Sequence, residues 1–297
     1  MSEEEMSYSP VGVIGAGVMG VGVAQDLAQT GHQVILIDIS DEILERAEQQ
    51  IKRNVRLHHL VKRGVERQNV AEVMERIRFS KEYGLLAGAE FVIENVTEDW
   101  NLKKSVYQDL DDICSPECAF AANTSAIPIS RIGAVTHRAP RVLGMHFMNP
   151  VPLKPVIEVI RGRHTSEETI EVAEALLARM GKEAIIVNDS PGFVSNRVLM
   201  LTINEAVSIL HEEVATVDAI DAIFRRCFAH EMGPLETADL IGLDTVLQTI
   251  RVLRDALSDS KYRPCPLLES MVDSGLLGRK SGQGFYSYEE GSQLPAG

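Results

Sequence analysis

Residues 11–20 read Val-Gly-Val-Ile-Gly-Ala-Gly-Val-Met-Gly, a short apolar run that leads directly into a G-x-G-x-x-G motif. This order predicts a strand, a tight turn and the start of a helix. Gly15 permits the turn, Gly17 lets the backbone approach a phosphate, and Gly20 lets the helix pack closely on the strand. The first turn of such a helix presents unpaired N–H groups and a partial positive charge. The stretch therefore predicts a site for the pyrophosphate of a dinucleotide.

The acid that follows this motif indicates which dinucleotide binds. A second apolar run, residues 33–37, ends in Asp38. A carboxylate at the end of the second strand accepts hydrogen bonds from both ribose hydroxyls. It also repels a 2′-phosphate, so Asp38 favours NAD over NADP. A purely structural turn is the less favoured interpretation of the motif.

The first two thirds of the chain alternate between short β-branched runs and helical patterns. This alternation predicts an α/β fold with a Rossmann-like, mostly parallel sheet and helices on both faces. Strands are expected at residues 11–14, 34–37, 91–94, 120–122, 142–146, 156–160 and 184–187, and helices at stretches such as 41–61 and 167–180.

The pattern changes after residues 188–192, Asn-Asp-Ser-Pro-Gly, because Pro-Gly marks a boundary. Helices are expected beyond it at residues 194–212, 217–228, 234–257 and 267–274. We therefore predict an NAD-binding domain over residues 8–190 and an all-helical C-terminal domain, for substrate binding or dimerisation, over residues 191–290. Abundant apolar positions between Val198 and Leu210 fit an internal core and a dimer interface equally well.

Composition limits the classes of partner. A chain of 297 residues with 45% hydrophobic and 24% charged residues is typical of a soluble globular protein. Its net charge of −14 argues against nucleic acid and anionic membranes as partners. We expect no membrane span, no signal peptide and no metal site. The four cysteines form no C-x-x-C pair and are expected to be reduced thiols of a cytoplasmic protein.

One stretch opposes the overall charge. Residues 52–67 carry six basic side chains, Lys52, Arg53, Arg56, Lys62, Arg63 and Arg67, against one acid, Glu66. Lys52, Arg56, Arg63 and Arg67 share a face at helical spacing. The favoured interpretation is a solvated helix face, and the alternative is a site for an anionic handle such as the phosphates of coenzyme A or an acidic carrier protein.

Four polar residues are candidates for the chemistry, and three of them lie at strand ends or at the start of the second domain. Ser125 follows the strand at 120–122, His146 ends the strand at 142–146, and Asn196 opens the helical half. Ligands of open α/β sheets bind at the carboxyl ends of strands, where Ser125 and His146 are expected. Glu158 stands inside an apolar strand.

The chemistry of alcohol oxidation matches these residue types. Transfer of a hydride from an alcohol to NAD requires a base for the hydroxyl proton, and histidine titrates near neutral pH. A carboxylate bonded to the other ring nitrogen fixes the tautomer and stabilises the imidazolium. Burial of Glu158 without a partner is costly, so His146 and Glu158 are expected to pair. A core or surface histidine and a solvent-facing glutamate remain the alternative.

Several longer motifs carry a family resemblance across residues 10–288. They are Gly-Ala-Gly-Val-Met-Gly, Asn-Thr-Ser, His-Phe-Met-Asn-Pro-Val-Pro, Val-Ile-Glu-Val-Ile-Arg-Gly, Pro-Gly-Phe-Val-Ser-Asn-Arg, Met-Gly-Pro-Leu-Glu-Thr-Ala-Asp-Leu-Ile-Gly-Leu-Asp and Gly-Arg-Lys-Ser-Gly-Gln-Gly-Phe-Tyr. With them the chain resembles the L-3-hydroxyacyl-CoA dehydrogenase family, especially its single-function 3-hydroxybutyryl-CoA dehydrogenase branch.

The resemblance implies reversible, NAD-dependent oxidation of a 3-hydroxyacyl-CoA thioester to the 3-oxoacyl thioester in fatty acid metabolism, by a homodimer. It implies that His146 is the catalytic base, that Glu158 orients it, and that Ser125 and Asn196 polarise the substrate. Cofactor contacts carried over from the family are Asp38, Glu98, Lys103, Asn149 and Lys280.

Two departures leave the substrate open. Asn95 stands where the family usually has Ala or Ser, and Met148 where it usually has Phe. A hydroxyacyl group on a carrier protein of a polyketide-type pathway is therefore an alternative substrate. A dehydrogenase of free β-hydroxyacids is less favoured, because residues 188–204 lack the lysine that such enzymes use. A crystallin-like structural role is disfavoured by the complete catalytic motifs.

Overall fold

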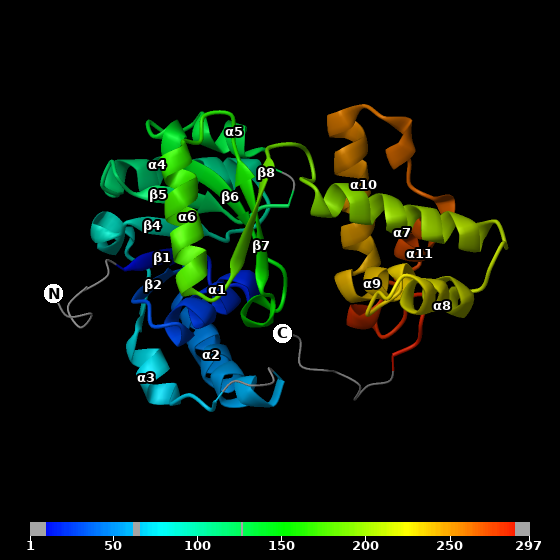
Figure 1. Cartoon of the computed structure of the whole chain (residues 1–297), viewed down its shortest axis with the longest axis horizontal. Helices are drawn as coiled ribbons and strands as arrows, with labels where there is room; N and C mark the ends of the chain where they lie inside the picture. The colour runs from blue at the N-terminus through cyan, green and yellow to red at the C-terminus, as the bar shows by residue number, and fades with distance from the viewer. Residues whose placement is uncertain (1–9, 62–65, 126, 289–297) are drawn as a thin grey trace. The chain divides into compact units, whose positions relative to one another are not determined.

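The computed structural model describes residues 10–61, 66–125 and 127–288. The chain divides into two compact units between Asp189 and Ser190. The first unit is built on a β-sheet and the second is helical (Figure 1). The predicted fold class, a Rossmann-like sheet domain followed by helices, is confirmed.

The first unit contains an eight-stranded sheet in the order β3-β2-β1-β4-β5-β6-β7-β8. Its strands are β1 (Val11–Ile14), β2 (Val34–Ile37), β3 (Ile77–Ser80), β4 (Phe91–Glu94), β5 (Ala119–Ala122), β6 (Val142–His146), β7 (Val156–Arg161) and β8 (Glu183–Asn188). All neighbouring strands are parallel except β6 and β7, which are antiparallel. Residues 147–155 join them without an α-helix, because antiparallel neighbours need no crossover.

Helices cover both faces of this sheet. They are α1 (Val18–Gln29), α2 (Asp41–Val61), α3 (Val70–Glu75), α4 (Trp100–Ile113), α5 (Ile129–Gly133) and α6 (Glu167–Arg179), with short 3-10 turns η1 (Tyr83–Gly88), η2 (Ala139–Arg141) and η3 (Val151–Leu153). Alternate strand residues, such as Val11 and Val13, share one core with α1, α2 and α6. Gly144 lies on the opposite face, where a Cβ would meet Ile129 of α5. Successive side chains of a strand therefore point to opposite faces of the sheet, and each face packs against its own layer of helices.

Strand β3 was not among the expected strands. Its sequence, Ile77-Arg-Phe-Ser80, offers only two apolar residues, and just one of its four residues is fully buried. It pairs only with β2, as the edge of the sheet. A short edge strand needs little apolar sequence, because one face and one edge remain open to water.

The second unit consists of α7 (Ser195–His211), α8 (Val217–Cys227), α9 (Pro234–Ile241), α10 (Leu243–Leu257) and α11 (Pro266–Asp273), with 3-10 turns η4 (Ser260–Tyr262) and η5 (Arg279–Ser281). The expectation of one helix over residues 234–257 is wrong. Gly242, at φ +99°, ends α9 and starts α10, because its backbone conformation is one that side chains disfavour.

Two buried aspartates hold the glycine-rich C-terminal segment. Asp239 of α9 accepts hydrogen bonds from the backbone N–H groups of Phe285 and Tyr286 at 3.0 and 2.9 Å. Asp221 of α8 accepts from the N-terminal N–H groups of α9 and from the Tyr286 hydroxyl. Cβ atoms at Gly278 and Gly284 would overlap Asp239, at 2.4 and 2.0 Å. The glycines of this motif therefore serve close packing.

A buried ion pair ties α1 to the loop after β6. Lys182 Nζ lies 2.8 Å from Asp26 Oδ2, and both side chains are nearly inaccessible. The same ammonium donates to the carbonyls of Val151 and Lys154 at 2.8 and 2.7 Å. Lys182 thus neutralises a buried carboxylate and fixes the η3 loop.

Lys182→Met is expected to lower the free energy of unfolding by about 3–5 kcal/mol, because it leaves the Asp26 charge buried without its cation. Urea unfolding followed by circular dichroism measures this loss. The double variant Asp26→Leu/Lys182→Met removes both charges and should recover most of the stability. A double variant no more stable than the single one would contradict this explanation.

Candidate active site

The register of β6 and β7 brings the predicted catalytic pair together. His146 ends β6 and stands directly opposite Glu158 in the antiparallel ladder. His146 Nδ1 lies 3.0 Å from Glu158 Oε2, and both side chains are buried. Residues opposite each other on neighbouring strands share one face of the sheet, which explains the contact.

Ser125 completes a linear array. Its Oγ lies 3.1 Å from His146 Nε2, so Ser125, His146 and Glu158 are joined in one line of hydrogen bonds. The loop that carries Ser125 is held by Glu98, which accepts hydrogen bonds from the Thr124 hydroxyl and, at 3.1 Å, from the Ser125 N–H. The structure thus brings these three predicted residues together, and their catalytic roles stay predictions.

The array determines which ring nitrogen can act as a base. An ionised Glu158 only accepts hydrogen bonds, so His146 Nδ1 carries the proton. Nε2 then has the free electron pair and faces the Ser125 hydroxyl. The buried carboxylate also stabilises the imidazolium that forms when Nε2 takes a proton.

The same three residue types in line also occur in serine hydrolases. Such enzymes need backbone N–H groups that are free to bind an oxyanion. Here the Ser125 N–H donates to Glu98. The array is therefore suited to accept a proton at Nε2, with Ser125 as a hydrogen-bonding group.

The glycine-rich turn has the geometry expected of a phosphate site. Gly15 adopts φ +88°, and Gly17 has open space where a Cβ would be. A Cβ at Gly20 would lie 1.7 Å from the Gly15 carbonyl oxygen, so only glycine fits there. The turn leads into α1, whose first residue, Val18, is 67% exposed. These features fit a dinucleotide pyrophosphate.

Asp38 lies at the end of β2 beside this turn. Its carboxylate accepts hydrogen bonds from the Ala16 N–H at 2.6 Å and from the Ile39 N–H at 2.7 Å. Ile39 itself is 84% exposed, which is unusual for isoleucine. Ile39 was not among the site residues predicted from the sequence, although an apolar residue directly after the acid is the available signal.

Lys103 lies in a buried polar cluster. Its ammonium contacts both Glu94 carboxylate oxygens, at 2.8 and 2.9 Å, and the Asn123 carbonyl at 3.2 Å. Glu98 lies 3.7 Å away. Burial raises the pKa of Glu94, and the Lys103 charge opposes that shift. Lys103 is fully enclosed, so a cofactor contact for it stays a prediction.

The other predicted site residues lie apart from this array or in the second unit. Asn149 is exposed in the loop after β6. Asn196 lies in the first turn of α7, and Lys280, in η5, contacts Asp244 at 2.5 Å. Asn196 and Lys280 belong to the second unit, and their proposed roles stay predictions.

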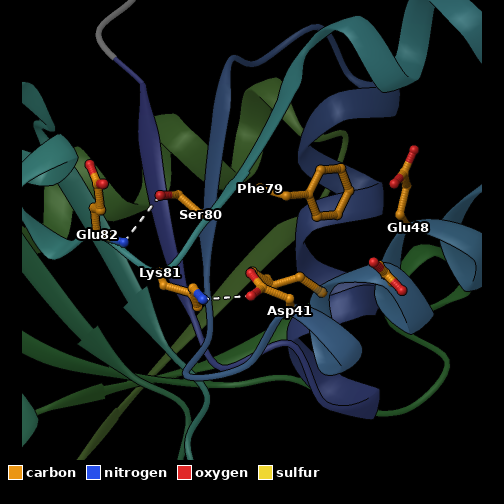
Figure 2. A pocket seen from close by; sticks show the side chains of 8 residues that line it. Asp41, Glu48, Phe79, Ser80, Lys81 and Glu82 are labelled. Carbon is orange, nitrogen blue, oxygen red and sulfur yellow. Dashed lines mark hydrogen bonds and ion pairs between the residues drawn. The ribbon is translucent and has the colours of Figure 1, made fainter.

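A cavity of about 400 Å³ lies elsewhere in the first unit, between α2 and β3 (Figure 2). Four carboxylates, from Asp41, Glu45, Glu48 and Glu82, line it, and Lys81 pairs with Asp41 at 2.5 Å. The cavity adjoins the edge strand β3. Five inter-strand spacings, or roughly 24 Å, separate β3 from β6, which carries His146. The negative lining of the cavity is unsuited to the phosphates of a dinucleotide.

The basic stretch is partly described. Lys52, Arg53 and Arg56 lie on α2, which ends at Val61, and Lys52 pairs with Glu48 at 2.5 Å. Arg53 and Arg56 are exposed. Arg67 lies beyond the helix rather than on it. Lys62 and Arg63 lie outside the described residues.

Comparison with known proteins identifies the family. The model of the 3-hydroxyacyl-CoA dehydrogenase NAD binding domain matches residues 10–190, and that of the C-terminal domain of the same family matches residues 192–288. A probable 3-hydroxybutyryl-CoA dehydrogenase of Bacillus subtilis (strain 168) is 47% identical over 285 residues, which are 96% of this chain and 99% of the relative.

A solved crystal structure supports the same family assignment. (S)-3-hydroxybutyryl-CoA dehydrogenase from Ralstonia eutropha has a TM-score of 0.90 and 41% identity, and the match covers 96% of this chain and 100% of that one. 3-Hydroxybutyryl-CoA dehydrogenase of Bradyrhizobium diazoefficiens is 42% identical over 96% of this chain and 97% of its own. The chain therefore belongs to the 3-hydroxyacyl-CoA dehydrogenase family and is an NAD-dependent oxidoreductase of 3-hydroxyacyl-CoA thioesters.

Proposed function

We propose that this enzyme oxidises a short 3-hydroxyacyl-CoA, of the 3-hydroxybutyryl-CoA class, with His146 as the base. The observation that carries the proposal is the line of hydrogen bonds from Ser125 through His146 to Glu158. The relatives named above as 3-hydroxybutyryl-CoA dehydrogenases support the substrate class. The carrier-protein substrate has no comparable support.

Each residue of the proposed site has a separate role in the reaction. His146 Nε2 takes the proton of the substrate hydroxyl, and Glu158 stabilises the imidazolium. The Ser125 hydroxyl hydrogen-bonds the substrate oxygen that becomes the carbonyl, and Asn196 keeps the substrate-polarising role that the family resemblance implies. NAD, when bound, supplies the hydride acceptor.

The cofactor is proposed to lie along one edge of the sheet. Parallel strands end at the same edge, so Asp38 after β2, Gly15 after β1 and His146 at the end of β6 all face it. Asp38 would hold the adenosine ribose and the exposed Ile39 would cover the adenine. The pyrophosphate would lie over Gly17, with Glu98, Lys103, Asn149 and Lys280 as further contacts.

We further propose a cytoplasmic homodimer that pairs through the helical unit. Val198, Ile223 and Phe228 of that unit are 60%, 49% and 62% exposed, and a dimer that pairs through this unit would cover them. All four cysteines are free thiols, as suits a reducing compartment. In the described residues, no helix is long and apolar enough to cross a membrane. A monomeric mass in sedimentation velocity would exclude the dimer.

The role of His146 is tested by His146→Gln, which should lower kcat for 3-hydroxybutyryl-CoA about 10²–10⁴-fold, because the base is lost. Glu158→Gln should lower kcat less, since the base remains but its cation loses the carboxylate. NAD binding, measured by fluorescence titration, should barely change. The exposed His164 provides the control His164→Gln. Near wild-type turnover of His146→Gln would refute the assignment.

Cofactor choice is tested by Asp38→Ser. The change removes the ribose acceptor and the charge that repels a 2′-phosphate, so the preference for NAD over NADP should fall, mainly through KM for NAD. The ratio of kcat/KM for the two cofactors measures it. Asp109→Ser, at an exposed position of α4, is the charge-matched control. An unchanged ratio at Asp38→Ser would assign the selection to another group.

The substrate handle is tested by Arg53→Gln/Arg56→Gln on α2. If the basic stretch binds the phosphates of coenzyme A, KM for acyl-CoA should rise, and more at low salt than at high salt. Arg78→Gln, exposed on β3, is the control. A rise in KM confined to acyl-carrier-protein substrates would favour a carrier protein as the partner. If KM rises with neither substrate, the basic stretch is only a solvated helix face.

A further inference from the structure

The side-chain amides of Asn95 and Asn123 form a hydrogen-bonded bridge at the ends of neighbouring strands, next to the proposed active site. Asn95 directly follows β4, and Asn123 directly follows β5. Asn123 Nδ2 donates to Asn95 Oδ1 at 2.8 Å, and Asn123 Oδ1 accepts from the Phe147 N–H at 3.3 Å. Asn95 Nδ2 donates to the Ile93 carbonyl at 3.1 Å. The bridge thus crosses from β4 through β5 to the end of β6.

Its end groups determine the orientation of both amides. The Phe147 N–H can only donate, so the Asn123 atom facing it must be oxygen. Nitrogen of Asn123 then faces Asn95, which must present its own oxygen. The remaining Asn95 nitrogen faces the Ile93 carbonyl, which can only accept. Each of the three nitrogens in this line donates one hydrogen bond to one acceptor, and hydrogen bonds in such a line strengthen one another.

Each end of the bridge adjoins the proposed chemistry. Phe147 directly follows His146, and Ser125 stands two positions after Asn123. On the other side, a Cβ at Gly15 would lie 2.8 Å from the Asn95 carbonyl oxygen, and the Cβ position of Gly20 lies 3.7 Å from the Asn95 Cβ. Asn95 therefore lies against the glycine-rich turn and is linked, through Asn123, to the backbone that follows His146.

We propose that Asn95 is a positioning residue that, through Asn123, holds the backbones of Ser125 and His146 at the separation their hydrogen bond requires. The proposal rests on the function proposed above. In this chain Asn95→Ala would remove the acceptor that Asn95 Oδ1 offers to Asn123 Nδ2 and would free Asn123 to turn, although alanine is usual at this position in the family. Catalytic groups tolerate displacements of only about 0.5 Å, so a loosened bridge lowers turnover before it affects binding.

The test compares Asn95→Ala and Asn95→Ser in the full chain. Asn95→Ala should lower kcat about tenfold while KM for NAD and for 3-hydroxybutyryl-CoA stays within about twofold. Asn95→Ser, which retains an acceptor, should recover part of the loss. Asn101→Ala, at an exposed position of α4, should behave as wild type.

A double-mutant cycle with Ser125→Ala distinguishes positioning from general destabilisation. If Asn95 acts through the Ser125–His146 pair, Asn95→Ala should cost little further kcat once Ser125 is removed. Additive losses, or a kcat of Asn95→Ala within twofold of wild type, would overturn the proposal. So would equal losses in kcat and in NAD affinity.

A readout without catalysis separates this proposal from the proposed function. The histidine side-chain 15N resonance of His146, assigned with His146→Gln, reports the hydrogen bond at Nε2. It should move in Asn95→Ala and not in Asn101→Ala, even if the wild-type chain fails to oxidise 3-hydroxybutyryl-CoA. An unmoved resonance would overturn the role of Asn95 and leave the proposed function intact.

Discussion

The antiparallel register of β6 and β7 is the constraint on which the proposed site depends. It sets His146 opposite Glu158 in a sheet whose other neighbouring strands run parallel. Side chains alternate between faces along a strand, so a slip of one residue would move Glu158 to the other face. A slip would also separate its charge from His146. The cost of that charge thus favours the register that the chemistry uses.

The remaining strands of the sheet determine where the reacting groups can lie. The parallel strands β2, β1, β4, β5 and β6 end at one edge of the sheet. Residues far apart in sequence therefore lie close together there because of the strand order alone. Glu94, the last residue of β4, forms a buried ion pair with Lys103 near this edge. Charges enclosed in this way are rigid, because each displacement separates an ion pair in a medium of low polarity.

Much of this arrangement could be predicted because it depends on patterns along the chain. Helix α2 and strands such as β1 and β4 occur at the expected residues, since apolar periodicity determines them. The pairing of His146 with Glu158 was expected from the cost of burying the acid, with a solvent-facing glutamate as the alternative, and the family resemblance implied the pair. The break at Gly242 was not expected, because glycine is tolerated within helices and only its positive φ, a tertiary property, ends α9.

The bridge of Asn95 and Asn123 belongs to the part that sequence reasoning misses. Both residues were visible, Asn95 as a departure from the family and Asn123 within Asn-Thr-Ser, yet amides carry no periodic or charge signal. Their meaning depends on which strand ends are neighbours, and on a backbone N–H at one end and a carbonyl at the other. A polar side chain in a strand-end loop therefore acquires a definite role only when the donors and acceptors around it are counted. In this chain the hydrogen bonds of Asn95 and Asn123 connect the strand end beside the glycine-rich turn to the backbone that follows the proposed base.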